Sequence, residues 1–358
     1  MNSISDPSQG VEVGCLEGSS LGIILKDYSS HRIIVIVDQN THDLCLEYLI
    51  TTFPQLEKAE IILLPVGEEN KVMEVCMQVW NAFSEYGFGR KDLVINLGGG
   101  LVTDMGGFLA SVYKRGMNFI HIPTSLLGMV DASIGGKNGI DLHHFKNQLG
   151  TINAPLKVFI DLSFLGTLPD VEFYNGYAEI MKYALIKDKE LFHEIKEFSD
   201  EKDFSRADVI IKCIQIKVDI VNLDLNELGE RKVLNFGHTF GHAIEGYFLE
   251  TAPVSHGHAV ALGICAESFV SMSRGTLSKE DYKEIETVLI RVYPFIQFTD
   301  KDIKEIIALM YNDKKNESGK IYSVLLEGIG CASFHNELSE NEIGAALMHI
   351  SMLSNTPN

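Results

Sequence analysis

The first half of the chain alternates between β-branched apolar runs and a segment with helical spacing. The apolar runs are RIIVIVD (32–38), EIILLPV (60–66) and DLVINLGGG (92–100), each ending at or beside Asp, Pro or Gly. Between the last two runs, residues 71–83 place apolar side chains at helical intervals. This order predicts βαβ units and a mostly parallel sheet, with a further strand expected at 158–161.

The pattern changes after the tripeptide TLP at 167–169, where long helical periodicities replace the apolar runs. The expected helices span 171–187, 205–222, 239–249, 257–273, 279–292 and 339–353, and the clearest strand is 321–326. We therefore predict an α/β fold with two domains. Residues 1–165 are expected to form a Rossmann-like nucleotide-binding domain, and residues 166–358 a mainly α-helical domain.

Composition and charge exclude several classes of protein. The 358 residues are enough for two domains, and a net charge of −19 argues against nucleic-acid or anionic-membrane partners. The first ten residues lack an apolar signal core, and no run of about 18 apolar residues occurs. Six scattered cysteines form no C-x-x-C pair, which is typical of buried free thiols. We expect a soluble cytoplasmic protein.

A glycine-rich loop follows the expected strand at 92–100 and opens a helix. Three consecutive glycines would allow close approach to a pyrophosphate, although Thr103 stands where the G-x-G-x-x-G fingerprint needs its third glycine. The loop is either a phosphate or dinucleotide site or a tight βα turn. Asp38, Glu68 and Lys71 also follow predicted strands, at the sheet edge where ligands bind in α/β folds, although each alone could be a capping or surface group.

Cationic side chains gather near a second glycine-rich segment, HIPTSLLGMVDASIGGKNGID (121–141). Arg115 precedes this segment, Lys137 lies within it and Lys146 follows it. The segment could be an ordinary polar loop. In so acidic a chain, however, the concentration of cations favours an anion-binding pocket.

The segment NGYAEIMKYALI (175–186) places Glu179 and Lys182 on one face of an apolar helix. The pair is either a surface salt bridge or part of a buried site. If Glu179 is buried, its carboxylate needs a cation or a metal ion.

Histidines are concentrated in the second half. Four of the twelve, His238, His242, His256 and His258, fall within 21 positions of apolar helical sequence. Two histidines and one glutamate around an open position form a catalytic zinc site. Spacing alone leaves open which histidine of each pair would be the ligand.

Several ordered motifs resemble one family over residues 32–330. They are GE-x-x-K (67–71), GGG-x-x-x-D (98–104), VD-x-S-x-GGK (130–137), KN-x-x-G (146–150), G-x-AE-x-x-K (176–182) and N-x-GHT-x-GHA-x-E (235–245). In these motifs the chain is similar to the 3-dehydroquinate synthases of the sugar-phosphate cyclase group. The resemblance implies an NAD-binding domain, a helical metal-binding domain and a homodimer. It also implies a lyase that converts 3-deoxy-D-arabino-heptulosonate 7-phosphate into 3-dehydroquinate and phosphate, in the shikimate pathway to the aromatic amino acids.

The same resemblance implies one divalent metal ion, zinc or cobalt, bound by Glu179, His238 and His256. His242 is then a proton relay rather than a ligand. This chain reads HGH where the family has HGE, so His258 is either a neighbouring group or a rival ligand. Side chains two positions apart on a helix point in different directions, which favours His256.

The remaining roles implied by the resemblance form three sets. The catalytic set is His242, Lys182, Asn235 and Arg231. The substrate-binding set is Arg115, Asp131, Lys137, Lys146, Asn147, Lys182, Lys217, Arg231, Asn235 and one of Lys314 or Lys315. The NAD-binding set is Asp38, Glu68, Lys71, Gly99, Gly100, Leu101, Asp104, Thr124, Ser125, Lys137, Lys146 and Thr167.

Three other functions compete with this interpretation. A sister cyclase would act on sedoheptulose 7-phosphate or glucose 6-phosphate, which lack the carboxylate; the presence of Arg231, Asn235 and a lysine at 314 or 315 favours the carboxylate-bearing substrate. A metal-dependent polyol dehydrogenase, which shares the glycine loop, would release NADH. A non-catalytic sugar-phosphate-binding protein would have lost the metal and proton-relay positions, which are intact here.

Overall fold

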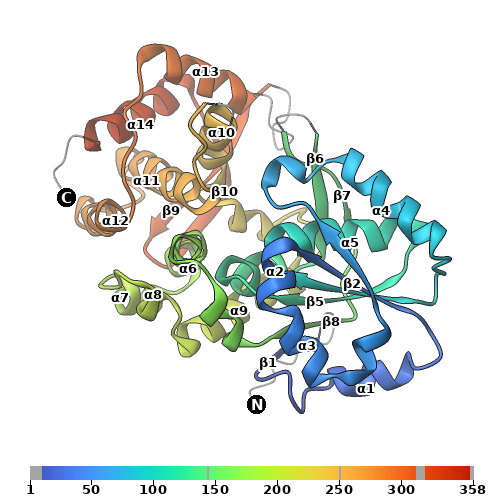
Figure 1. Ribbon diagram of the computed structural model, residues 1–358. Helices are drawn as coiled ribbons and strands as arrows, with labels where there is room; N and C mark the ends of the chain where they lie inside the picture. Colours follow the sequence, from blue (N-terminus) through green and yellow to red (C-terminus); the bar gives the residue numbers. More distant parts are fainter. Residues whose placement is uncertain (1–9, 143–144, 250, 312–318, 355–358) are drawn as a thin grey trace. The chain divides into compact units, whose positions relative to one another are not determined.

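The computed structural model describes residues 10–142, 145–249, 251–311 and 319–354, and its chain forms two compact units (Figure 1). The first unit contains Met1–Phe173 together with Ile210–Val218, and the second contains Tyr174–Val209 and Asp219–Asn358. A division into folding domains between residues 165 and 166 stays a prediction.

In the described part of the first unit, six parallel strands form one sheet. They are β1 (Val11–Val13), β2 (Ile33–Asp38), β3 (Glu60–Leu64), β4 (Leu93–Gly98), β5 (Asn118–Pro123) and β8 (Lys157–Ile160). Their order across the sheet is β1-β8-β5-β4-β2-β3. The predicted α/β class with a mostly parallel sheet is confirmed.

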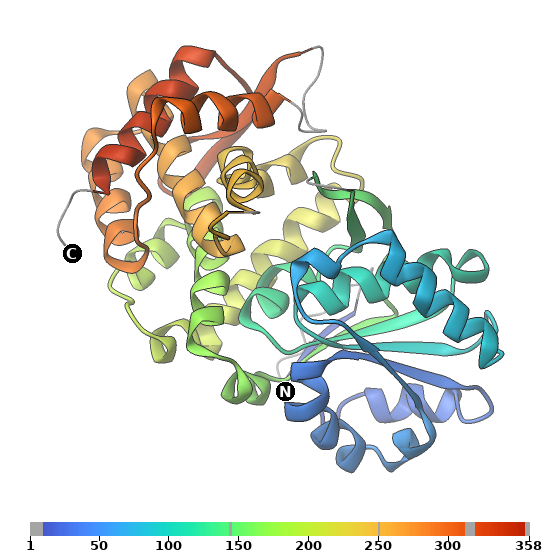
Figure 2. The ribbon, with the colours of Figure 1, turned by 45° about the horizontal axis from the view of Figure 1, so that its top comes forward.

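Helices cover both faces of this sheet because its central strands are apolar on both sides. Helices α4 (Met73–Glu85) and α5 (Gly100–Val112) pack on one face, where they share a buried cluster with strand residues such as Ile34 and Val94. Figure 2 shows α1 (Leu21–Asp27), α2 (Gln39–Leu44) and α3 (Leu46–Thr52) on the other side.

An antiparallel hairpin, β6 (Lys137–Leu142) and β7 (Phe145–Ile152), stands apart from the sheet. Its Ile140 belongs to the core under α4 and α5, so the hairpin is fixed to the sheet side that carries these helices. Lys137 begins β6, and Lys146 and Asn147 lie in β7, so this hairpin of the first unit carries three of the residues predicted to bind substrate.

The second unit is mainly helical, as predicted. Its principal elements are α6 (Asp170–Lys187), α7 (Lys189–Ile195), α8 (Glu201–Phe204), the ends of α9 (Ala207–Leu223), α10 (His238–Phe248), α11 (His256–Arg274), α12 (Lys279–Val292), α13 (Asp300–Tyr311) and α14 (Glu340–Leu353). Strands β9 (Ile321–Gly328) and β10 (Cys331–Leu338) form an antiparallel hairpin. The apolar core joins α10, α11, α13, α14 and β9.

Helices α10 and α11 approach each other very closely through glycine. A Cβ atom on Gly263 would lie 1.8 Å from the carbonyl oxygen of Gly237, which no side chain could accommodate. This contact places the two histidine-bearing helices side by side. Among the residues described, no helix combines the length and apolarity needed to cross a bilayer.

Candidate active site

The first group of predicted residues lies at the carboxyl edge of the parallel sheet. The turn η2 (Glu68–Asn70) follows β3, and the glycine loop joins β4 directly to α5. The loop stands where the order of strands reverses between β2 and β4, the usual ligand position in open α/β sheets. Gly99 packs tightly here, since a Cβ on it would come within 3.2 Å of the Ser125 hydroxyl oxygen.

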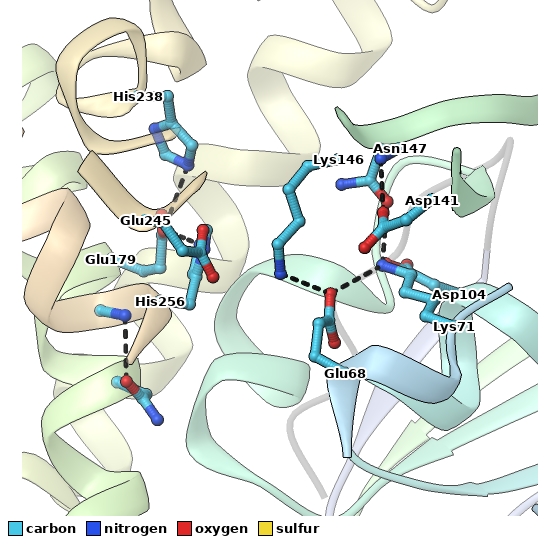
Figure 3. Close-up of polar contacts among 12 residues, drawn as sticks. Glu68, Lys71, Asp104, Asp141, Lys146, Asn147, Glu179, His238, Glu245 and His256 are labelled. Carbon is cyan, nitrogen blue, oxygen red and sulfur yellow. Dashed lines mark hydrogen bonds and ion pairs between the residues drawn. The ribbon is translucent and has the colours of Figure 1, made fainter. Parts of the chain in front are cut away.

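Lys71 is the centre of a buried polar network at this edge (Figure 3). Its side chain is nearly inaccessible, and its Nζ donates to Asp104 Oδ2 at 2.7 Å and to Asn147 Oδ1 at 2.8 Å. Burial alone would lower the pKa of Lys71, but the carboxylates of Asp104, Glu68 and Asp141 outweigh it and raise that pKa. Lys71 is therefore held as a cation.

Two further ion pairs of the first unit also involve predicted site residues. Lys146 Nζ lies 2.9 Å from Glu68 Oε1, and Lys217 Nζ lies 2.8 Å from Asp131 Oδ1. Burial raises the pKa of Asp104 despite its contact with Lys71. The structure thus brings predicted cofactor-binding and substrate-binding residues into direct contact within one unit.

Other predicted cofactor residues also lie near the ends of strands. Asp38 ends β2, and its Oδ1 accepts the backbone N–H of Thr41 at 2.8 Å, which caps α2. Thr124 and Ser125 follow β5 and are buried, while Thr167 ends the 3-10 helix η5 (Leu162–Thr167).

Arg115 does not join this cluster. It ends η3 (Tyr113–Arg115) just before β5, so it lies at the amino edge of the sheet, where it lines a surface pocket with Arg90 and Lys91. Lys137 begins β6 and is exposed. Lys314 and Lys315 lie outside the described residues.

The second group lies in the helical unit and has the geometry of a metal site. Glu179 comes from α6, His238 begins α10 and His256 begins α11. Glu179 Oε1 lies 3.4 Å from His238 Nε2 and 3.6 Å from His256 Nε2, and one ligand atom of each residue falls within 4.8 Å of the others. A tetrahedral zinc ion holds its ligand atoms roughly 3.3–3.6 Å apart, so both separations from Glu179 suit such an ion.

Contacts behind the histidine rings orient their Nε2 atoms toward Glu179 (Figure 3). His238 Nδ1 lies 3.0 Å from the carbonyl oxygen of Phe236, and His256 Nδ1 lies 3.3 Å from Glu245 Oε2. Both acceptors require a proton on Nδ1, which leaves the Nε2 lone pair for a metal ion.

The electrostatics also favour a cation at this position. Glu179 is fully buried, its Oε2 forms an ion pair with Lys182 Nζ, and its Oε1 faces the Nε2 atoms of both histidines. Burial would raise the pKa of Glu179, but Lys182 and His238 lower it well below its ordinary value. Burial opposes charge on His256, yet its contacts with Glu179 and Glu245 raise its pKa to about 10. A bound metal ion would replace that proton.

The remaining two histidines of the cluster have separate surroundings. The ring of His242 lies 5.2 Å from that of His238, centroid to centroid, and 6.1 Å from that of His256. His258 instead reaches the carbonyl oxygen of Pro294 and stacks on Tyr293. His258 therefore does not face the three predicted ligands.

Arg231 and Asn235 occupy the 3-10 helix η6 (Glu230–Asn235) before α10. Arg231 is almost fully buried, and its Nη1 donates to the carbonyl oxygen of Leu225 at 2.7 Å. Asn235 Nδ2 donates to Glu227 Oε1 at 2.7 Å. These contacts stabilise the loop and position both side chains within the helical unit.

Two residues at these sites were not assigned a role from the sequence. Glu245 follows His238 by seven positions on α10, a spacing that places both on one helix face and could have indicated its contact with His256. Asp141 contacts Asn147 across the β6–β7 hairpin, which no regular alternation of apolar and polar residues indicates in the sequence.

Comparison with solved structures defines the class. The chain is similar to 2-epi-5-epi-valiolone synthase from Streptomyces hygroscopicus subsp. jinggangensis, which was solved with NAD+ and Zn2+ bound. The two structures superpose with a TM-score of 0.84 at 30% sequence identity, and the match covers 98% of this chain and 99% of that one. A 2-deoxy-scyllo-inosose synthase structure shares the fold at a TM-score of 0.77, covering 95% and 96% of the two chains at 23% identity. The fold is thus that of the cyclases.

Sequence comparisons identify the family. Family models for the 3-dehydroquinate synthase N-terminal and C-terminal regions match residues 61–175 and 176–316. The 3-dehydroquinate synthase of Parabacteroides distasonis is 37% identical over 328 residues, covering 91% of this chain and 93% of that protein. The Clostridium botulinum enzyme is 39% identical over 313 residues, with 86% and 88% coverage. The chain belongs to the 3-dehydroquinate synthase family, which confirms the resemblance.

Proposed function

We propose that this protein is an NAD- and metal-dependent lyase that converts 3-deoxy-D-arabino-heptulosonate 7-phosphate into 3-dehydroquinate and phosphate. The observation that carries the proposal is the arrangement of Glu179, His238 and His256, whose ligand atoms lie within 4.8 Å of one another. Two relatives that are 37% and 39% identical to this chain are 3-dehydroquinate synthases, and each match covers most of both chains.

The proposed cofactors supply chemistry that the side chains lack. When bound, NAD+ accepts and returns a hydride and the zinc or cobalt ion acts as a Lewis acid toward substrate hydroxyls. The reaction breaks one carbon–oxygen bond to phosphate and forms one carbon–carbon bond, without net oxidation. The glycine loop at the switch between β2 and β4 is the proposed NAD site, with Glu68, Lys71 and Asp104 beside it.

The chain's own residues bind the substrate and move protons. Lys146 and Asn147 present an ammonium and an amide that suit a phosphorylated anion. Arg231, with Asn235 beside it, is proposed to hold the substrate carboxylate. His242 lies one helical turn from the ligand His238 and is proposed to accept and return substrate protons.

Arg115 is proposed to contact substrate bound to a second copy of the chain. Since it lies at the amino edge of its own sheet, away from Glu68 and Lys71, its predicted substrate contact would be made in a second copy of the chain. This is compatible with the predicted homodimer, for which sedimentation velocity is the direct measurement. The cytoplasmic location also stays a prediction.

One experiment tests the proposed reaction. Purified protein is incubated with the heptulosonate 7-phosphate, NAD+ and a zinc or cobalt salt, while phosphate, 3-dehydroquinate and NADH are measured together. The proposal predicts equal amounts of phosphate and 3-dehydroquinate with no accumulation of NADH. Steady accumulation of NADH without phosphate would instead identify a polyol dehydrogenase.

A further inference from the structure

Asp141 links two segments that carry predicted ligand-binding residues (Figure 3). It lies in β6 and is 9% exposed. Its backbone N–H donates to the carbonyl oxygen of Lys71 at 2.8 Å, and its Oδ1 accepts the backbone N–H of Asn147 at 2.6 Å. One aspartate therefore joins the turn after β3 to the hairpin strand β7.

The bond from Asp141 stabilises an uncommon backbone conformation. Asn147 has a φ of +52°, in the left-handed region that residues other than glycine adopt uncommonly, although asparagine does so more readily than most. A buried carboxylate that accepts this N–H stabilises that conformation because a charge-assisted hydrogen bond is stronger than a neutral one.

The left-handed turn determines where two neighbouring side chains point. Asn147 Oδ1 accepts from Lys71 Nζ at 2.8 Å, while the preceding residue, Lys146, places its Nζ 2.9 Å from Glu68 Oε1. If Asn147 relaxed to an ordinary extended conformation, the backbone between these two side chains would rotate. Lys146 and Asn147 would then no longer face the same group of residues.

We propose that Asp141 is a positioning residue that holds Lys146 and Asn147 in the orientation needed to bind the phosphorylated substrate acid. It acts through the Asn147 backbone and makes no contact with the substrate itself. This inference rests on the proposed function, because it names a residue on which substrate binding by that site depends.

The test compares two variants with the wild type by steady-state kinetics with the heptulosonate 7-phosphate. Asp141→Ala removes the acceptor and is expected to raise KM roughly tenfold with a much smaller change in kcat. Asp141→Asn keeps an oxygen that can accept the same N–H and is expected to bring KM back to within about threefold of the wild type. If Asp141→Ala does not fold, Asp141→Gln, which displaces the acceptor by one methylene, replaces it.

Asp92 provides a matched control in the same unit. It is also 9% exposed, and its carboxylate accepts the backbone N–H groups of Arg32 at 2.9 Å and Gly89 at 2.7 Å. These contacts lie at the amino edge of the sheet, before β2 and β4. Asp92→Ala is therefore expected to lower Tm without raising KM.

A double-mutant cycle tests whether Asp141 acts through Asn147. On an Asn147→Gly background, where glycine adopts the left-handed conformation without help from Asp141, the further change Asp141→Ala is expected to add less than about twofold to KM, since coupled residues are not additive. Three results would overturn the inference. The first is that the effects of the two substitutions on KM multiply, the second that KM is unchanged in Asp141→Ala, and the third that the Asp92 and Asp141 variants change KM and Tm equally.

The wild-type chain separates this inference from the proposed function. A wild type that turns over the heptulosonate 7-phosphate while Asp141→Ala behaves identically would reject only the role of Asp141. A wild type with no turnover would reject the function. Calorimetry with inorganic phosphate would then decide the role of Asp141: several-fold weaker binding in Asp141→Ala supports it, and equal binding overturns it.

Discussion

The contact between Glu245 and His256 predicts a specific loss of metal affinity. Glu245 is buried on α10, and its Oε2 lies 3.3 Å from His256 Nδ1. The change Glu245→Ala leaves all three proposed metal ligands in place but removes the acceptor that fixes the His256 ring. The ring could then turn its Nε2 atom away from Glu179.

The expected magnitude follows from the strength of this hydrogen bond. A bond to a charged group contributes about 1.5–3 kcal/mol, and a separation of 3.3 Å favours the lower part of that range. Since each 1.4 kcal/mol is a factor of ten, about 1.5–2 kcal/mol corresponds to a zinc affinity weakened roughly tenfold to thirtyfold. This agrees with the usual effect of removing the partner of a metal-bound histidine.

The assay is competition for zinc between metal-free protein and a chromophoric chelator at neutral pH. Glu245→Gln, which retains an acceptor oxygen, is expected to lose less than about fivefold. NAD+ affinity and Tm serve as controls for folding. Zinc affinity in Glu245→Ala equal to that of the wild type would refute the role of Glu245, and a complete loss would show that Glu245 is itself a ligand.

Four further predictions concern other parts of the molecule. His238→Ala is expected to abolish tight metal binding, whereas His242→Ala keeps the metal and slows turnover by roughly 10²-fold or more; metal analysis showing equal losses would contradict these roles. Arg231→Ala is expected to weaken substrate binding at least tenfold more than NAD+ binding, and calorimetry showing equal losses would contradict that. Arg274 and the capping box of α14 lower the pKa of Glu342 to about 2, so Glu342→Gln should reduce the free energy of unfolding by about 1–2 kcal/mol at neutral pH. Because the folded-state pKa is depressed, that difference should disappear as the pH falls from about 4.5 to about 2 in acid-denaturation curves, and a difference independent of pH would contradict it. Gly257→Ala places a Cβ 2.3 Å from the Cα of Asn175 and should lower both Tm and zinc affinity, whereas Gly344→Ala, with no atom within 4 Å, should leave both intact.

Much of the fold could be predicted from the sequence because its central strands and long helices have strong periodicity. The run at 32–38 corresponds to β2 (Ile33–Asp38), and the pattern at 257–273 corresponds to α11 (His256–Arg274). The β6–β7 hairpin was missed because its sequence, rich in glycine and polar residues, does not alternate as an exposed strand does. Helix α13 was also missed.

The site could be predicted only in part. The family resemblance implied Glu179, His238 and His256 as ligands, and the structure brings these three together, whereas spacing alone left open which histidine of each pair would bind a metal ion. The contact of Asp141 with Asn147 depends on a left-handed backbone conformation, which periodicity does not indicate. The position of Arg115 at the amino edge of the sheet also required the strand order.

The substrate preference tests the proposed function most directly. One measurement compares kcat/KM for the heptulosonate 7-phosphate with kcat/KM for sedoheptulose 7-phosphate, which lacks the carboxylate that Arg231 is proposed to bind. The account predicts release of 3-dehydroquinate and phosphate from the first substrate, with a preference of at least about a hundredfold. Turnover of sedoheptulose 7-phosphate with none of the heptulosonate would contradict it and identify a sister cyclase.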